Sequence, residues 1–403
     1  MRLRRLLARA PASALGLTLT LGLAPALAAC TGHADDAPDR RWRAVSLPLP
    51  PGPSGRIAVR EATRCGDSWY VVGGVFLDHP TQDQDSRPAA WRSTDGRAWT
   101  PLAIDARTFW GQRAILASVA CAHGTVAVVG ARSGGAHGNP RVTTFYEDAA
   151  GLHDVDAPYT QYGGEQATNV GPIAGGAGGW LITGNRVSGP AVWTSPTGHA
   201  FTIHEGAPGL ANDATVTALA QDAAWDGRQW VVVGGGNGNA PGDSLDRQPE
   251  AWTSPDGATW SRETVPGSLQ FDDVERAVAT PDGVLALGLR GSSFGSWHRH
   301  ATWTEGETFG HLPSDASKSP FVASLSMRVT SGADDFWATT SDGARYALWR
   351  SADGDSWTKV ATPTRAPDTG GEHILSVAAD AAGVLLLSDD GARGRIWVTD
   401  GTG

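Results

Sequence analysis

Apolar residues fall in short runs along this chain, and polar turns separate the runs at regular intervals. Runs of four to six β-branched or aromatic residues bounded by Gly, Asp and Pro are typical of strands, and residues 230–234 are one example. No stretch after residue 30 has the apolar spacing and the start and stop signals of a long amphipathic helix. The 52 glycines suit many tight turns. The pattern predicts an all-β protein.

The runs belong to a unit that repeats seven times. Each unit has an inner strand, a second apolar run, a loop of variable length, a third strand led by an aromatic residue, and a polar turn into a fourth strand. A unit of ~40–50 residues that buries its apolar faces only against its neighbours is typical of propellers. We therefore predict a seven-bladed β-propeller. The leading aromatic residues lie 46 to 59 residues apart and are Trp91, Phe145, Trp193, Trp252, Trp303, Trp349 and Trp397.

The two ends of the repeat array complement each other. The seventh unit stops before its fourth strand, and residues 41–46 resemble the fourth strands that begin at Trp99 and Trp357. If this N-terminal segment completes the last blade, the ring closes and leaves no sheet edge exposed. We expect residues 41–403 to form one domain.

Four of the polar turns carry nearly the same phrase. It reads Ser-Thr-Asp-Gly at residues 93–96 and Ser-Pro-Asp-Gly at residues 254–257, each followed three residues later by Trp. The phrase resembles the Asp-box, or BNR, repeat of sialidase-like propellers, with one residue fewer between Asp and Gly. The resemblance covers about ten residues in each of four blades. It implies that the carboxylate caps turn amides and that the Trp packs between blades, away from the active-site face. The residues concerned are Asp95, Trp99, Asp256, Trp260, Asp353 and Trp357.

The residues that sialidases need are not evident. That family holds the substrate carboxylate with three arginines and uses a Tyr nucleophile, and a Phe/Tyr-Arg-Ile-Pro motif marks the first arginine. The nearest phrase is Gly-Arg-Ile-Ala at residues 55–58, which lacks the aromatic residue and the proline. Characterised sialidases also have six blades rather than seven. We do not expect sialidase activity.

The first 30 residues have the layout of a secretory signal. Four arginines precede the uncharged apolar stretch 10–29, which ends in Leu-Ala-Ala-Cys at residues 27–30. This ending resembles the lipobox of bacterial lipoproteins, which implies lipidation of Cys30. We expect a signal peptide at 1–29, a tether at 30–40, and a propeller anchored through the lipid on the extracytoplasmic face of the cell membrane. An ordinary signal peptide cleaved near Ala29 is the alternative.

Charge and cysteine content narrow the choice of partners. The formal net charge is −10, and without the four arginines of the leader it is about −14. This argues against nucleic acid or an anionic membrane surface as the main partner. Cys65 and Cys121 occupy equivalent positions in adjacent units. Outside the cytoplasm such a pair favours a disulfide, with two free thiols as the alternative.

A ligand is expected on the face where the loops into the innermost strands meet the loops between second and third strands, because variable loops on a rigid scaffold carry most recognition. Aromatic residues there, including Tyr162, suit a sugar or a peptide. For the acidic residues, a solvated rim is a simpler interpretation than a catalytic role. His298 and His300 have strand spacing, but we expect an exposed loop there rather than a metal pair. The candidate face comprises Arg60, Trp110, Arg113, Tyr159, Glu165, Asp273, Glu275, Trp297 and Glu372.

The preferred hypothesis is a membrane-anchored binding module without catalysis, whose ligand is a glycan or an envelope protein. We expect a monomer without cofactor or metal. The second hypothesis is a carbohydrate-active enzyme, a glycosidase or lyase that uses the acidic residues of the rim, because glycoside hydrolysis needs two carboxyl groups ~5–9.5 Å apart. An assembly chaperone for an envelope complex is the third, and it requires a protein partner.

Overall fold

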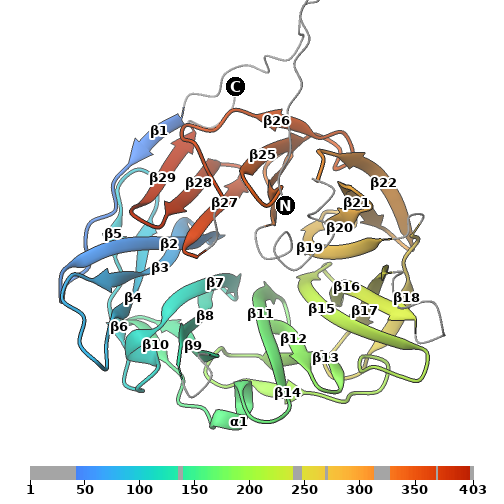
Figure 1. Ribbon diagram of the computed structural model, residues 1–403, viewed down its shortest axis with the longest axis horizontal. Coiled ribbons are helices and arrows are strands. Elements are labelled where there is room, and N and C mark those ends of the chain that lie inside the picture. Colours follow the sequence, from blue (N-terminus) through green and yellow to red (C-terminus); the bar gives the residue numbers. More distant parts are fainter. Residues whose placement is uncertain are drawn as a thin grey trace, which may run out of the picture. The chain divides into compact units, whose positions relative to one another are not determined.

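The chain forms a seven-bladed β-propeller, seen in a computed structural model that describes residues 42–134, 139–238, 247–267, 271–312, 327–368 and 371–399. Seven sheets, antiparallel apart from one short edge strand in blade 2, are arranged around a central axis (Figure 1). The predicted fold class is therefore confirmed. The predicted signal peptide, Cys30 and the tether lie outside the described residues, and within them no helix is long and apolar enough to cross a membrane.

Each blade runs outward from its innermost strand. The innermost strands are β2 (Gly55–Cys65), β7 (Ile115–Ala122), β11 (Ala167–Gly176), β15 (Val216–Trp225), β19 (Asp272–Thr280), β23 (Arg328–Ser331) and β27 (His373–Asp380). The second strands are β3 (Ser68–Leu77), β8 (Thr125–Ser133), β12 (Gly179–Arg186), β16 (Trp230–Gly238), β20 (Gly283–Arg290), β24 (Phe336–Ser341) and β28 (Gly383–Asp390).

The outer half of each blade consists of a third and a fourth strand. The third strands are β4 (Ser86–Ser93), β9 (Pro140–Asp148), β13 (Gly189–Ser195), β17 (Arg247–Ser254), β21 (Ser293–Arg299), β25 (Tyr346–Ser351) and β29 (Gly394–Thr399). The fourth strands of blades 1 to 6 are β5 (Thr100–Pro101), β10 (Gly151–Asp154), β14 (Thr202–His204), β18 (Ser261–Thr264), β22 (Trp303–Phe309) and β26 (Thr358–Val360). Blade 2 adds β6 (Ile104–Asp105), and two short turns, η1 (Gly111–Arg113) and α1 (Tyr159–Tyr162), precede the innermost strands of blades 2 and 3.

The N-terminal strand closes the ring as predicted. Strand β1 (Trp42–Val45) pairs antiparallel with β29, with Trp42 opposite Thr399 and Val45 opposite Ile396. It is the fourth strand of blade 7, in which the strand order is β1-β29-β28-β27 (Figure 1). The pairing covers the edge that β29 would otherwise expose.

Apolar side chains pack between blades, so the core consists of seven clusters. The cluster between blades 4 and 5, for example, joins Val231 and Val233 to Val274 and Val284. The third-strand aromatic residue is fully buried in most of these layers, as for Trp91, Trp193 and Trp252. This arrangement explains why the repeat carries a large aromatic residue at that position.

The repeat assignment was wrong in blade 5. We expected Trp303 to lead its third strand, but Trp303 begins the fourth strand β22, and Trp297 takes the third-strand position in β21. Trp297 is fully buried and donates its indole N–H to the carbonyl of Pro266 at 2.9 Å. Trp297 therefore belongs to the core and has no place on the ligand face.

The repeated polar turns are capped by their own carboxylates. Asp256 Oδ1 accepts backbone N–H groups from Ala258 at 2.9 Å and Thr259 at 2.8 Å. These hydrogen bonds hold the pKa of Asp256 at about 2. Gly257 has φ +74°, which a side chain rarely adopts, and its carbonyl accepts the indole N–H of Trp260 at 3.2 Å. The turns at Asp95 with Trp99, and at Asp353 with Trp357, repeat this pattern.

β-Bulges on the innermost strands help to join the blades. In blades 1, 2 and 4 the side chain that follows the bulge accepts a backbone N–H from the innermost strand of the following blade. Glu61 accepts from Val119 at 2.7 Å. Asp222 accepts from Ala277 at 3.1 Å. These acidic residues are therefore part of the ring's own structure.

Cys65 and Cys121 form a disulfide across 56 residues of sequence. They lie on β2 and β7 and so link the innermost strands of blades 1 and 2. The bridge spans the interface that also buries Tyr70 and Leu116.

Candidate functional site

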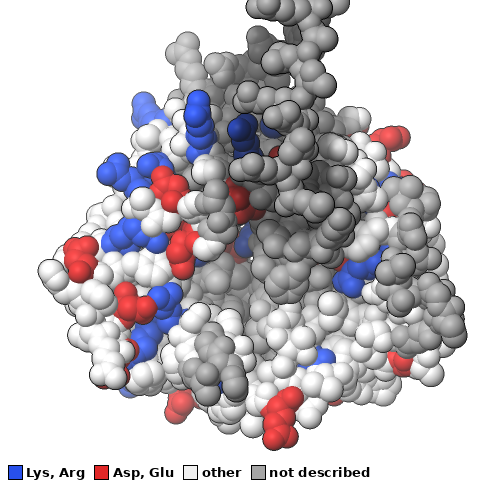
Figure 2. All heavy atoms as spheres, viewed as in Figure 1, with Lys and Arg blue, Asp and Glu red and all other residues white. Residues whose placement is uncertain are grey.

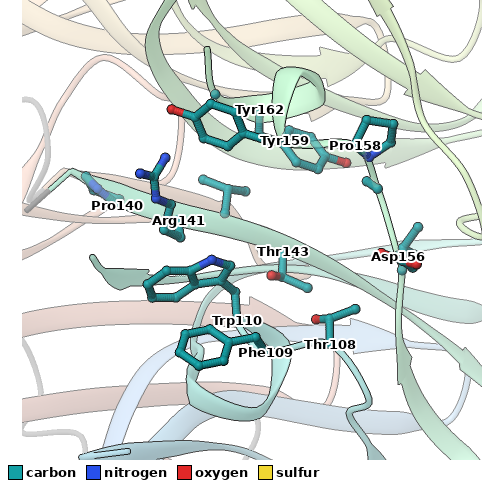
Figure 3. A pocket seen from close by; sticks show the side chains of 14 residues that line it. Thr108, Phe109, Trp110, Pro140, Arg141, Thr143, Asp156, Pro158, Tyr159 and Tyr162 are labelled. Atoms are coloured by element: carbon teal, nitrogen blue, oxygen red, sulfur yellow. The ribbon is translucent and has the colours of Figure 1, made fainter. Parts of the chain in front are cut away.

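A pocket lined by aromatic residues opens where the loops before the innermost strands of blades 2 and 3 meet the start of β9. Its volume is about 280 Å³. Trp110 and Phe109 come from the loop before β7, and Tyr159 and Tyr162 come from α1, before β11. Figure 3 shows these two pairs of rings on opposite sides of Arg141 and Thr143 of β9. We call this set the blade 2–3 pocket.

The loop that carries Trp110 is held by a carboxylate of blade 2. Asp154, at the end of β10, accepts the backbone N–H groups of Arg107 at 2.9 Å and Thr108 at 2.8 Å. The Thr108 hydroxyl donates to the same carboxylate at 2.6 Å. The loop is therefore fixed by hydrogen bonds before any ligand arrives, which reduces the entropy cost of binding.

Two glycines make room for the aromatic rings. A Cβ on Gly134 would stand 2.0 Å from Cη2 of Trp110, and a Cβ on Gly163 would stand 2.6 Å from Cε2 of Tyr159. Both rings therefore lie directly on backbone, which limits their orientation. Trp193 holds α1 in place, because its indole N–H donates to the carbonyl of Gln161 at 2.7 Å.

The walls of the pocket combine apolar surface with a cation. Tyr159 and Phe109 are 60% and 52% exposed, which is high for large apolar side chains. The guanidinium carbon of Arg141 lies 4.7 Å from the ring centroid of Tyr159, and a hydrogen bond from Arg141 lowers the pKa of that phenol. Exposed rings beside a hydrogen-bond donor suit a ligand with a flat apolar face and polar edges, such as a sugar or a peptide.

Two of the predicted ligand-face residues meet near the axis of the ring. Arg60 pairs with Glu372 and with Asp389, the latter at 3.0 Å, and Arg56 pairs with the same Asp389 at 2.8 Å. Asp389 lies near the end of β28. It was not predicted from the sequence, because a position within an apolar strand suggested a core residue. These cations are neutralised within the protein, so the cluster has a structural role.

Two other predicted residues form a buried carboxyl pair. Asp273 and Glu275 lie on β19, with exposures of 2% and 0%. Asp273 is paired with Arg247 of β17, whereas neither carboxylate oxygen of Glu275 has a hydrogen-bond partner among the described residues. Burial, and then the neighbouring Asp273, raises the pKa of Glu275 well above its ordinary value; burial also raises the pKa of Asp273. The expectation of a solvated rim is wrong for this pair.

The remaining predicted positions have other surroundings. Arg113 is buried, and its guanidinium carbon lies 3.5 Å from the ring centroid of Phe109. Its side chain also donates to the Phe109 carbonyl, so Arg113 supports the loop that carries Phe109. Glu165 is exposed in the loop before β11. Trp110, Tyr159 and Tyr162 are the predicted residues that share the pocket, whereas Arg141 and Phe109 carried no motif that would have identified them.

Of the histidine pair, His300 lies in an exposed bend as expected, whereas His298 does not. His298 lies on β21 rather than in a loop, and its Nε2 lies 2.9 Å from Asp355 of blade 6. His300 Nδ1 lies 3.2 Å from Asp282. Each imidazole thus has its own carboxylate. Within the described ranges, no group of three or more His, Cys, Asp or Glu side chains is arranged to hold a metal.

Comparisons with known proteins assign this chain to no family. No family model and no curated relative matches the chain. Among solved structures it resembles Trypanosoma rangeli sialidase in complex with the inhibitor DANA, at 11% identity and a TM-score of 0.42 over 86% of this chain. The chain spans 55% of that sialidase's length.

Two archaeal structures are similar to a comparable degree. The β-propeller domain of the trilobed protease from Pyrococcus furiosus matches at 9% identity and a TM-score of 0.44, covering 86% of this chain and 96% of that one. The acylaminoacyl peptidase of Pyrococcus horikoshii matches at 9% identity and 0.44, covering 86% and 51%. At such identities and TM-scores these likenesses assign neither a family nor a function to the chain.

Proposed function

We propose that this protein is an exported, lipid-anchored propeller that binds a sugar or a peptide in the blade 2–3 pocket without catalysis. The observation that carries the proposal is the seating of Trp110 and Tyr159 on the backbone of Gly134 and Gly163. Rings held in this way present exposed aromatic surface at little entropy cost. The lipobox-like ending at Cys30 and the distant resemblance to Asp-box propellers support the location and the class of scaffold.

The proposal is tested by titrating a panel of envelope glycans and peptides against the protein and following Trp fluorescence. We expect Trp110→Ala to weaken binding of the selected ligand by about 2 kcal/mol, roughly 30-fold, as for a central aromatic contact. Val187→Ala is the control, because it removes an apolar side chain that is 65% exposed and does not line the pocket. A ligand whose affinity is the same for both variants would place the site elsewhere.

A second variant tests the seating of the ring. Gly134→Ala leaves every polar group of the pocket in place, but its methyl group would overlap Trp110. We expect it to weaken the same ligand while the melting temperature stays close to that of the parent protein. Unchanged affinity for Gly134→Ala would contradict the argument that Trp110 is held in a binding orientation.

The alternative function is a carbohydrate-active enzyme, and the buried Asp273–Glu275 pair is the observation in its favour. Burial raises the pKa of Glu275 well above its ordinary value, and a raised carboxyl pKa is what a general acid requires. However, Glu275 is fully buried, so a substrate would reach it only if the surrounding residues moved. Product formation abolished by Glu275→Gln would establish this alternative.

A further inference from the structure

A groove on the outer side of blade 6 is lined by three cations. It lies between β25, β26 and the connection that follows β26, and its volume is about 850 Å³. Arg345, Lys359 and Arg365 line it, and all three are exposed. Beneath them Val360 and Ala366 pack with Trp42 in the cluster between blades 6 and 7. We call these residues the blade 6 groove.

Among the residues that the structure describes, no carboxylate forms an ion pair with the cations of this groove. No Asp or Glu is among the described residues that line the groove, and none of its three cations has an ion pair within the described part of the chain. Asp342 is nearby, but it accepts the backbone N–H of Arg345 at 2.7 Å. Many of the other described arginines form ion pairs, as Arg350 does with Asp335 at 2.6 Å. The whole chain has 42 acidic and 32 basic residues, so the charge of this groove is opposite in sign to the net charge of the protein.

The groove lies where the chain enters the ring. Strand β1 begins at Trp42, whose indole N–H donates to the carbonyl of Ala361, a groove residue, at 3.2 Å. The next residue along β1, Arg43, is also exposed. Figure 2 shows Lys and Arg side chains along the edge of the ring that carries β1 and β26. Four cations thus lie at the edge nearest to the preceding residues of the chain.

We infer that this edge binds the anionic surface of the membrane that anchors the protein. The inference rests on the proposed anchor at Cys30. Between that cysteine and Trp42 lie 11 residues, which at ~3.6 Å per residue reach at most about 40 Å. The edge at β1 is therefore held within reach of the lipid headgroups.

The overall negative charge does not prevent this contact. At an ionic strength of about 0.15 M, charges separated by more than about 8 Å are largely screened. The sign of the surface that touches the headgroups therefore decides the interaction. Each Lys or Arg near an anionic surface is worth roughly a fivefold gain in partition. The groove would fix which edge of the ring faces the membrane and leave the blade 2–3 pocket, on other blades, open to ligand.

Vesicle co-sedimentation tests the inference with residues 39–403, the compact unit that contains all seven core clusters. Phosphatidylcholine vesicles with and without phosphatidylglycerol are compared at about 0.15 M salt. We expect binding to the anionic vesicles alone. The variant Arg345→Gln/Lys359→Gln/Arg365→Gln should lose roughly 100-fold in partition. The control Arg97→Gln/Arg107→Gln/Arg228→Gln removes the same charge from exposed positions on blades 1, 2 and 4 and should bind as the parent does.

Equal partition of the two triple variants, or no preference for the anionic vesicles, would overturn the inference. Displacement from the vesicles by free glycerol phosphate at low concentration would overturn it as well, because the groove would then be a site for a small soluble anion. Failure of the anchor itself is recognised separately, since the full chain and Cys30→Ser would then partition equally between membrane and soluble fractions. Ligand binding in the blade 2–3 pocket is independent of both outcomes.

Discussion

The free energy of unfolding of this propeller should decrease as the pH rises from about 4 to 7. Three buried carboxyl groups have raised pKa values, namely Asp222, Asp273 and Glu275. Burial raises the pKa of Asp222 from 3.8 to about 6. An acid with a raised pKa binds its proton more tightly in the folded state, so stability is greatest below the unfolded pKa and is lost as the pH rises through the folded pKa.

The shift of Asp222 alone corresponds to about 3 kcal/mol lost between about pH 4 and pH 6. Glu275, whose pKa is raised well above 4.5, extends the loss to higher pH. Carboxylates with lowered pKa values, such as Asp256 at about 2, stabilise the folded state. This contribution is lost only when they are protonated, below about pH 4. Burial lowers the pKa of His204, so this residue makes the folded state slightly more stable as the pH rises and opposes the trend. The stability maximum is therefore expected near pH 4–5.

Glu275→Gln isolates one of these groups. The amide is neutral and close in shape, so at pH 7.5 the variant should melt above the parent protein and show a flatter dependence on pH. Glu165→Gln, at an exposed position, is the matched control and should leave the curve unchanged. A parent protein that gains stability from pH 5 to 7.5, with Glu275→Gln less stable at pH 7.5, would show that Glu275 is ionised and paired in the fold.

Removal of the disulfide should be the largest single loss of stability. The bridge between Cys65 and Cys121 closes 56 residues, and the loop-closure relation gives about 4 kcal/mol for a loop of that length. The double variant Cys65→Ala/Cys121→Ala should therefore unfold at a clearly lower denaturant concentration and temperature. Reduction of the parent protein should have a similar effect.

The comparison of reduced and oxidised parent protein is the control for packing, because Cys→Ala also removes buried sulfur. Cys65 is 4% exposed, so part of the loss in the double variant comes from packing. Equal denaturation midpoints for the reduced and oxidised protein would contradict a stabilising bridge between blades 1 and 2.

The architecture was predictable because each blade repeats the same packing requirement. A large aromatic residue in the third strand and a glycine in the following turn recur at the spacing of one blade. The last repeat lacks a fourth strand, and this indicated where residues 41–46 would pair. The exception is blade 5, where Trp297 and Trp303 both precede polar residues. With no Ser-x-Asp-Gly phrase after either, the sequence offered no way to decide which begins the third strand.

The candidate site was predictable only in part, because it depends on contacts between distant segments. Trp110 and Tyr159 were singled out as aromatic residues in loops of the expected face, and both line one pocket. The contact of Gly134 with Trp110 and the place of Arg141 arise from the packing of β8 and β9 against the loops. The burial of Glu275 follows from a bulge in β19 and cannot be recognised in a list of acidic residues.

We propose that the ring binds a ligand and does not transform it. The most direct test incubates residues 31–403 with a mixed panel of glycans and envelope polysaccharides and analyses the mixture by mass spectrometry before and after incubation. The account predicts unchanged masses, with retention of some components by the parent protein but not by Trp110→Ala. A new product that disappears with Glu275→Gln or Asp273→Asn would contradict it and place catalysis on β19.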